Sequence, residues 1–546
     1  MKKYIKIILS LLMMFSFSAC HEDFLTEQPY DFIGPDNFYN NADELEDLVS
    51  GVPRIFRETG SGMMGRNWYL LVETPAPAVT NRYNLTHLRT QMDSWTYNSG
   101  HSYINSVWLA LYRGVNRANA VIDNGPNIED DKEEPVGYNK RDRVVAEAKF
   151  YRALIYFFLT ELWGEVPLRT EETVSLDGLE LEKSPRSEIY NVIIQDLKDA
   201  EGKLPYADEY SGSTNDIGRP NKGAAQALLA KVLLTRAQRP EAQGSDLNDA
   251  NAKLDEIISS GRHGLAANYA DLIYFHNPGG SEDYAAHNYE VMFDLQFTSA
   301  GFGATGNNFM SPRNSDIGKN KWTTFAAEFE YVRSFEESDT RGDANFVLEY
   351  NNQNGGDLVV YNLDSVIWDG YRDEAMSFTK RLDPDPAVEG REEPNMKFLR
   401  YADVLLMKAE ALDLLGQTNN AYEYVNMVRR RAFGKDPNSP DVDVDWVPGS
   451  LANFRLELYK ERLKELVLEN WGTIDMRRMW DVATPIVEAH SKHVEMQPDE
   501  DGTMVEILND GPKWEVTDFS DKFKVFPIPA QAMDRNPSLI QTPGWD

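Results

Sequence analysis

The stretch VVAEAKFYRALIYFFLTELWG, residues 144–164, decides the fold of this chain. Its apolar side chains recur every three or four residues, the period of a helix that buries one face. They are Val144, Val145, Ala148, Tyr151, Ile155, Phe158, Leu159 and Leu162. Gly164 and Pro167 follow and predict the end of this helix. The preceding stretch 107–122 has the same spacing, so the two stretches predict an antiparallel helix pair.

Two further helix pairs are predicted along the chain. Ser184 and Pro185 supply an N-cap and a proline at the first helical position. The predicted helices of these pairs cover residues 185–205, 222–237, 399–415, which Gly416 closes, and 420–432. Helix pairs of this kind resemble tetratricopeptide units, which stack because one pair cannot bury its own apolar face. The sequence therefore predicts an all-α dominated fold of tetratricopeptide-like helix pairs, with long loop-rich insertions and a few short strands.

Two long segments interrupt the helical pattern. Between residues 261 and 395 the helical period fades, and 291–297 alternates like a short strand among glycine, asparagine and proline. The segment 30–105 is similarly mixed, with one amphipathic stretch at 45–56. Because loops of this length in a compact domain are often functional, both segments are candidate ligand-binding regions.

The N-terminus carries the pattern of an export signal that ends at the chain's single cysteine, Cys20. Lysines at positions 2, 3 and 6 precede an apolar run at 7–17, and Ser18 and Ala19 are the small residues expected before a processed cysteine. The run is too short for a membrane-spanning helix, which needs about 20 apolar residues. We therefore predict a lipoprotein whose Cys20 carries several acyl chains, such as palmitate, since one chain alone anchors only marginally.

Composition excludes several classes of protein. The net charge of −33 would repel a nucleic-acid backbone, so no nucleic-acid partner is expected. No cysteine remains after Cys20 for disulfides or thiolate metal sites, so the exported fold must depend on core packing. The content of 42% hydrophobic residues makes a large core feasible.

Motifs for cofactors, metals and catalysis fail on inspection. Two glycine patterns, at 60–65 and 301–306, lack the strand-then-helix setting that dinucleotide binding needs, so no cofactor is expected. Asp441, Asp443 and Asp445 begin like a calcium loop, but Trp446 replaces the glycine of its sharp turn, so no metal site is expected. The eight histidines are scattered, and no catalytic residues are predicted.

Four stretches together resemble the SusD/RagB family of surface nutrient-binding lipoproteins. They are 146–153 leading to the Trp163-Gly164 turn at 162–168, then 399–411, then 461–478, and finally the proline-rich end at 526–545. One departure from the family pattern is Trp471-Gly472, where relatives usually carry a larger polar residue than glycine. The resemblance implies a signal peptide at 1–20, a SusD-like N-terminal region at 21–240, and a C-terminal region at 241–546 with the ligand-loop insertion, the third helix pair and an extended proline-rich tail.

The resemblance also implies a function. Members of this family sit on the outer face of the outer membrane, bind a nutrient, usually a glycan, and deliver it to a TonB-dependent SusC-like transporter. We therefore expect a binding protein and no enzyme. A peptide-binding member of the same family stays open as an alternative, and so do a secreted glycan-cleaving enzyme and a pure assembly scaffold.

The expected ligand-binding residues come from loops rich in aromatic and amide side chains, because sugar rings stack on aromatic planes. They are Arg82, Trp95, Tyr97 and Asn98 before the first repeat, and Tyr274 and Trp322 in the second insertion. A tryptophan packed under its loop is an equally good reading for Trp95. The charged residues Arg400, Asp403, Glu410, Glu461 and Arg462 are interpreted as ion pairs between neighbouring helices.

Overall fold

The computed structural model describes most of the chain beyond the N-terminal region. The described residues are 41–57, 65–81, 88–129, 137–175, 178–210, 218–276, 289–297, 309–312, 315–318, 324–353, 358–360, 376–385, 393–490, 495–498, 504–507 and 520–545. Cys20 and the signal segment lie outside them.

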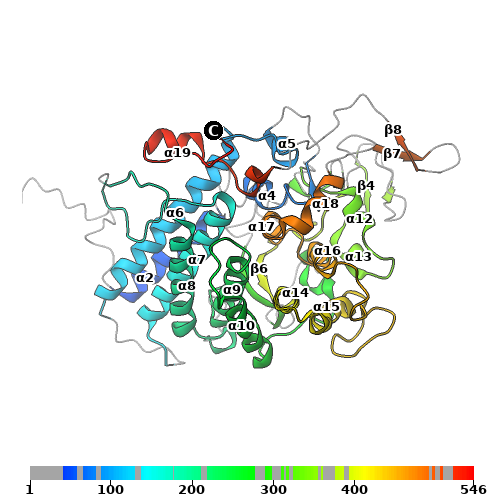
Figure 1. Ribbon diagram of the computed structural model, residues 1–546, viewed down its shortest axis with the longest axis horizontal. Helices are drawn as coiled ribbons and strands as arrows, with labels where there is room; N and C mark the ends of the chain where they lie inside the picture. Colours follow the sequence, from blue (N-terminus) through cyan, green and yellow to red (C-terminus); the bar gives the residue numbers. More distant parts are fainter. Residues whose placement is uncertain are drawn as a thin grey trace, which may run out of the picture.

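The body of the protein is a stack of antiparallel helices (Figure 1). Its members are α6 (Ser102–Asn124), α7 (Lys140–Trp163), α8 (Arg186–Lys203), α9 (Lys222–Arg236), α10 (Asp246–Ser260), α14 (Tyr401–Leu414) and α15 (Thr418–Ala432). Each helix packs on the next, and α14 packs on both α9 and α10, so the stack continues across the long insertion. The predicted fold class is confirmed, with α10 as a helix that the sequence patterns had not singled out.

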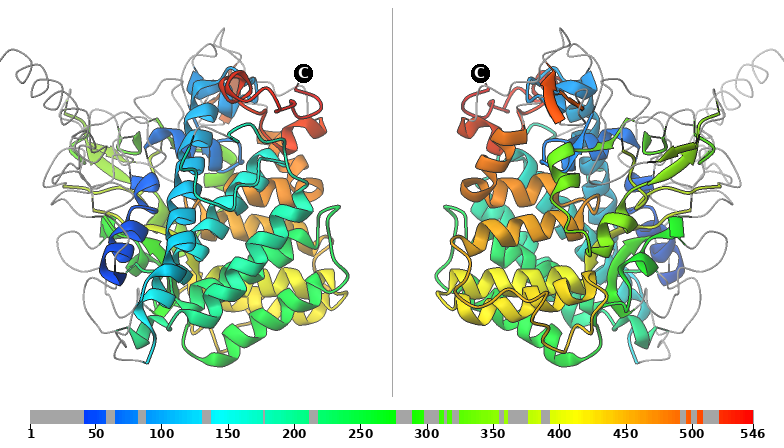
Figure 2. Two further views of the ribbon diagram at one scale, coloured as in Figure 1. Left: turned by 90° about the vertical axis from the view of Figure 1, so that its left-hand side faces the viewer. Right: turned by 90° about the vertical axis from the view of Figure 1, so that its right-hand side faces the viewer.

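Shorter elements surround the stack. The helices are α2 (Ala42–Ser50), α3 (Arg54–Arg57), α4 (Arg66–Val72), α5 (Leu88–Asp93), α12 (Phe329–Arg333), α13 (Thr340–Asn345), α16 (Phe454–Leu466), α17 (Gly472–Arg478), α18 (Trp480–His490) and α19 (Ala530–Arg535). Within the described residues, two-stranded antiparallel sheets pair β1 (Val79–Thr80) with β3 (Ala326–Ala327), β2 (Val291–Leu295) with β6 (Met396–Arg400), β4 (Glu349–Asn351) with β5 (Leu358–Val360), and β7 (Glu495–Pro498) with β8 (Met504–Ile507). Figure 2 shows α19 and the C-terminal segment at the opposite end of the molecule from α14 and α15.

Local capping explains where the main helices begin and end. The Asn139 side chain accepts from the backbone N–H of Asp142 at 3.1 Å to start α7. Asn221 caps α9 in the same way through Ala224, at 2.9 Å. Gly164 ends α7 with a φ of 83°, a left-handed conformation that favours glycine.

Three predicted boundaries are wrong by a few residues. Residues 399 and 400 belong to β6, because Met396–Arg400 pairs with β2 and this pairing delays the start of α14. Pro185 is the N-cap of α8, since Ser184 is held in a bridge to Val166. The C-terminal tail is not wholly extended, because Ala530–Arg535 forms α19 after Pro529.

Buried ion pairs connect the helices, as predicted for Asp403, Glu410 and Arg462. The Arg462 guanidinium reaches Asp403 at 2.9 Å and Asp475 at 2.6 Å. Lys231 contacts the same Asp403 at 2.7 Å, and Arg478 pairs with Glu410. These contacts join α9, α14, α16 and α17 through the interior.

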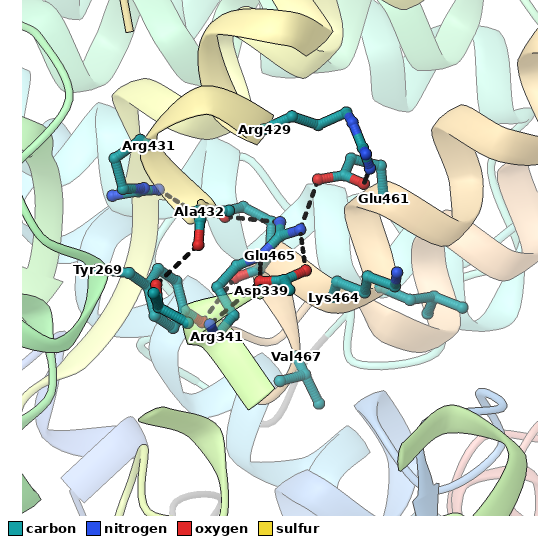
Figure 3. Close-up of polar contacts among 12 residues, drawn as sticks. Tyr269, Asp339, Arg341, Arg429, Arg431, Ala432, Glu461, Lys464, Glu465 and Val467 are labelled. Atoms are coloured by element: carbon teal, nitrogen blue, oxygen red, sulfur yellow. Dashed lines mark hydrogen bonds and ion pairs between the residues drawn. The ribbon is translucent and has the colours of Figure 1, made fainter. Parts of the chain in front are cut away.

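A second buried cluster holds the long insertion against the stack (Figure 3). Glu465 of α16 contacts Arg341 at 3.1 Å, Arg400 at 2.9 Å and Arg431 at 2.5 Å, and all four side chains are inaccessible to solvent. Glu290 also contacts Arg400 and Arg431. Arg341 itself lies in α13 and is fully buried.

Glu73 holds the tight turn between α16 and α17. Its buried carboxylate accepts from the backbone N–H of Asn470 at 2.6 Å and of Leu468 at 3.3 Å. Leu468 and Asn470 have φ of 59° and 78°, so the turn is strained and needs these bonds. A Cβ on Gly472 would lie 2.7 Å from the Glu73 carboxylate, which explains why the chain has glycine where the family pattern has a larger residue.

Burial raises the pKa of Glu73 to about 8, against the effect of its two backbone hydrogen bonds and the charge of Lys380. A carboxyl group with a raised pKa stabilises the fold below its unfolded pKa, and this stability is lost as pH rises toward 8. We therefore expect the free energy of unfolding of the wild type, relative to Glu73→Gln, to fall by up to about 1.4 kcal/mol per pH unit between pH 5 and 8.

Urea unfolding of both proteins across this pH range is the measurement. The difference should level off above pH 8. Lys380, whose own pKa burial lowers to about 8, titrates in the same range and its charge acts on Glu73, so the slope reports the two groups together. A pH-independent difference between the two would show that Glu73 is ionised in the folded protein.

Candidate functional site

Two aromatic residues before the first repeat, Trp95 and Tyr97, pack against the C-terminal part of the chain. The Trp95 ring stacks on Trp480 of α18, with centroids 5.8 Å apart and planes 27° apart. The Tyr97 ring stacks on Trp545, with centroids 5.4 Å apart and planes 26° apart. Phe523 lies against both inner rings, at 5.3 Å from Trp95 and 5.8 Å from Tyr97.

The burial of Trp95 and Tyr97 bears on their predicted role as ligand-binding residues. Trp95 is only 4% exposed and Tyr97 only 3% exposed, so neither presents a free face to solvent. The backbone of Trp95 also has a φ of 56°. A residue other than glycine keeps this conformation only when the surrounding structure holds it there. The structure thus gives Trp95 and Tyr97 a packing role in place of the predicted stacking on ligand, because the tail closes over them.

The outer members of the stacked pairs are partly exposed. Trp480 and Trp545 are half-buried, and the neighbouring Thr96 and Asn98 are exposed. The Asn98 Oδ1 accepts from the backbone N–H of Gly100 at 2.9 Å, which orients this amide at the surface. Partly exposed indoles together with an exposed amide and an exposed hydroxyl are the side-chain types that contact a sugar ring. We call Trp480, Trp545, Thr96 and Asn98 the aromatic platform.

The sequence reasoning missed Trp480 and Trp545 as candidates. Trp480 lies two residues after the motif 461–478, and Trp545 ends the proline-rich stretch 526–545, so both are next to or within stretches that carry the family resemblance. Their proximity to 95–98 depends on the path of the tail. Nothing in the spacing of residues more than 350 positions apart predicts that contact.

Arg477 fixes this tail to the helical body. Its guanidinium donates to the carbonyl of Phe523 at 3.1 Å and to that of Leu162 at 3.2 Å, and it lies 4.0 Å from the ring centre of Phe526. Burial lowers the pKa of Arg477 to about 10, and burial raises the pKa of Tyr97 to about 12. Both groups therefore keep their ordinary charge states at neutral pH.

The remaining predicted ligand residues fall outside the described residues. This applies to Arg82, to Trp322 and to the side chain of Tyr274, whose backbone begins the short helix η7 (Tyr274–His276). The chain next to two of them is described. The Asn81 side chain donates to the carbonyl of Thr324 at 2.9 Å, and β1 pairs with β3. The two candidate insertions are thus in contact, as a shared binding region requires.

Within the described part of the chain, no group of three or more histidine, cysteine, aspartate or glutamate side chains is arranged to hold a metal ion. The aspartates at 441–445 serve the local turn: Asp445 pairs with Arg430 at 2.6 Å, and Asp441 accepts from the backbone N–H of Asp443. No helix within these residues has the length and hydropathy to cross a bilayer.

Comparison with known families covers almost the whole chain. Residues 274–545 match the SusD family, and residues 24–234 match a family described as starch-binding and associating with the outer membrane. The chain belongs to the SusD/RagB family. The resemblance seen in the sequence is confirmed, and the SusD family assignment brings glycan binding and outer-membrane association as properties of the family.

Individual SusD relatives are similar along their full length. SusD-like protein P25 of Formosa agariphila is 26% identical over 525 residues, which cover 88% of this chain and 91% of that protein. The crystal structure of a SusD homologue from Bacteroides thetaiotaomicron has a TM-score of 0.75 at 23% identity and covers 93% of this chain and 98% of its own. A laminarin-binding SusD-like protein has a TM-score of 0.68 at 21% identity and covers 93% and 100%. These structures confirm the fold.

Proposed function

We propose that this SusD/RagB protein is a lipid-anchored surface protein that captures a glycan and delivers it to a TonB-dependent SusC-like transporter. The observation that carries glycan capture is the aromatic platform, where half-buried indoles lie beside an exposed amide. The similarity to a laminarin-binding SusD-like protein supports the same class of ligand. The platform binds without cleaving, so the chain is proposed to have no enzymatic activity.

A binding and cleavage screen tests this proposal. Purified protein is titrated with oligosaccharides of different linkages and with peptides, in buffer with and without a chelator, and each glycan is then analysed for shorter products. Binding of a glycan with no cleavage is expected. Binding of peptides alone would show that the ligand is a peptide and not a glycan. Release of shorter sugars would show that the protein is an enzyme.

Trp480→Ala is expected to weaken glycan binding by about 1 to 3 kcal/mol, because one aromatic contact is lost. Calorimetry gives the affinity, and thermal unfolding gives the stability of the same sample. Trp446→Ala is the matched control, since Trp446 is also half-buried but lies in the loop between α15 and α16. Equal affinities of the two variants would remove Trp480 from the site.

Cys20→Ala is expected to release the protein from the membrane, because the proposed anchor is attached to this residue. Fractionation of cells that lack the partner transporter measures the effect, and the variant should move from the outer-membrane pellet to the soluble fraction. A variant that stays in the pellet under these conditions would contradict the proposed lipid anchor.

A further inference from the structure

A groove lies between α7, α8 and the short helix η3 (Gly125–Asn127) that ends α6. Its volume is about 610 Å³. Gly125, Pro126, Val145 and Ala146 form its apolar part. Pockets of roughly 300 to 1,000 Å³ hold small organic ligands, so this groove has room for a short oligosaccharide. Two other cavities, beside Arg400 and beside Arg462, are each about 10 Å³ and have room for about one water molecule.

The lining of the groove is cationic in a strongly acidic protein. Four basic side chains line it, Arg141, Lys149, Lys198 and Lys203, against two acidic ones, Asp142 and Asp199. The whole chain has a net charge of −33. A recess with a positive surplus concentrates anions from solution, most strongly when the surrounding surface repels them.

The ion pairs inside the groove do not neutralise all four of its basic side chains. Asp142 accepts from both Arg141 and Lys203, at 2.8 Å and 2.9 Å. Asp199 pairs with Lys149 at 2.5 Å. Lys198 is exposed and, among the described residues, has no ion-pair or hydrogen-bond partner. Its ammonium group is therefore free to meet an anion that enters the groove.

The groove is separate from the aromatic platform. Helix α6 has 23 residues and therefore spans about 35 Å. The tail helix α19 contacts the N-terminal part of α6, where Asn105 donates to Gln531 at 3.0 Å. The groove begins at Gly125, just beyond the other end of α6. One short ligand cannot fill both places.

We propose that this groove is a second binding site, for an acidic saccharide that carries carboxylate or sulfate groups. The apolar part at Pro126 and Val145 contacts the sugar ring, and Lys198, with Arg141 beside it, pairs with the anionic substituent. This inference rests on the proposed glycan capture and narrows its substrate class to glycans with negative charge.

The test compares two charge reversals with the same effect on net charge. Lys198→Glu changes the groove, whereas Lys183→Glu changes a partly exposed lysine that lies just before α8, about 20 Å away along the helix. The probes are trigalacturonic acid, a sulfated carrageenan oligosaccharide of similar length, and neutral maltotriose, measured by calorimetry at low and high salt. Thermal unfolding confirms that each variant is folded, and Lys198→Gln serves as a milder second variant.

The wild type should bind at least one acidic probe, and raising the salt concentration should weaken this binding because the groove is open to solvent. Lys198→Glu should weaken it about tenfold or more, and Lys183→Glu should leave it within twofold. The choice between the carboxylated and the sulfated probe identifies the substituent. Equal affinity in all variants, or no binding of either acidic probe, would overturn the groove site. Binding of a neutral glycan that depends on Trp480 would in that case still leave the proposed function standing.

Discussion

Glu465→Ala is expected to destabilise the protein by about 3 to 5 kcal/mol. Glu465 contacts three arginines whose side chains are fully buried, Arg341, Arg400 and Arg431. Burial alone would raise the pKa of Glu465, but these charges hold it well below its usual range. Removing the carboxylate leaves buried positive charges without their shared partner, which costs more than the lost packing.

Urea unfolding followed by circular dichroism measures this loss, with Glu457→Ala as the matched control. Glu457 lies on the same helix and pairs with Lys460 at 2.8 Å, but both side chains are partly exposed, at 33% and 42%. An exposed pair of this kind contributes about 1 kcal/mol or less. Similar losses in the two variants would show that the cluster at Glu465 is not the tie between the insertion and the helical stack.

Trp95→Ala is expected to lower the free energy of unfolding by about 3 to 5 kcal/mol, because it opens a cavity in a packed aromatic cluster. The ring contacts Trp480 and Phe523, so its removal loosens both α18 and the C-terminal segment. Protection of backbone amides from hydrogen exchange should fall around Phe523 in particular.

Thr96→Ala is the control for the stability measurement alone, since the exposed Thr96 follows Trp95 in the chain and belongs to the aromatic platform. It should change the stability by less than about 0.5 kcal/mol. Thermal unfolding and glycan titration of the same samples separate packing from binding. An unchanged stability of Trp95→Ala together with a large loss of affinity would return Trp95 to the ligand site.

Much of the fold could be predicted from local patterns. The apolar period of 144–164 and the turn at Gly164 act within a few residues of themselves. Their physical consequences are therefore visible in the sequence. The errors lie where distant segments compete, as at Arg400, which joins β6 through pairing with β2 and an ion pair to Glu290.

The candidate site was less accessible to sequence reasoning. The aromatic residues Trp95 and Tyr97 were predicted as ligand residues, but they are buried, and the half-buried partner of each ring comes from the other end of the chain. The sequence around Trp95 does not distinguish a buried ring from an exposed one. Only the course of the tail, fixed by Arg477 and by a bond from Phe526 N–H to the Leu162 carbonyl at 2.7 Å, decides which ring is inside.

The sequence by itself determined the helical repeat, the family and the excess of negative charge, because periodicity, motifs and composition are properties of the chain alone. Tertiary structure alone decided which charges are buried around Glu465, which indoles are exposed, and that Lys198 lines a cationic groove. Burial and charge pairing depend on which distant segments meet. Which side chains are buried and paired is therefore decided by the packing of the whole molecule, and a local sequence pattern does not predict it.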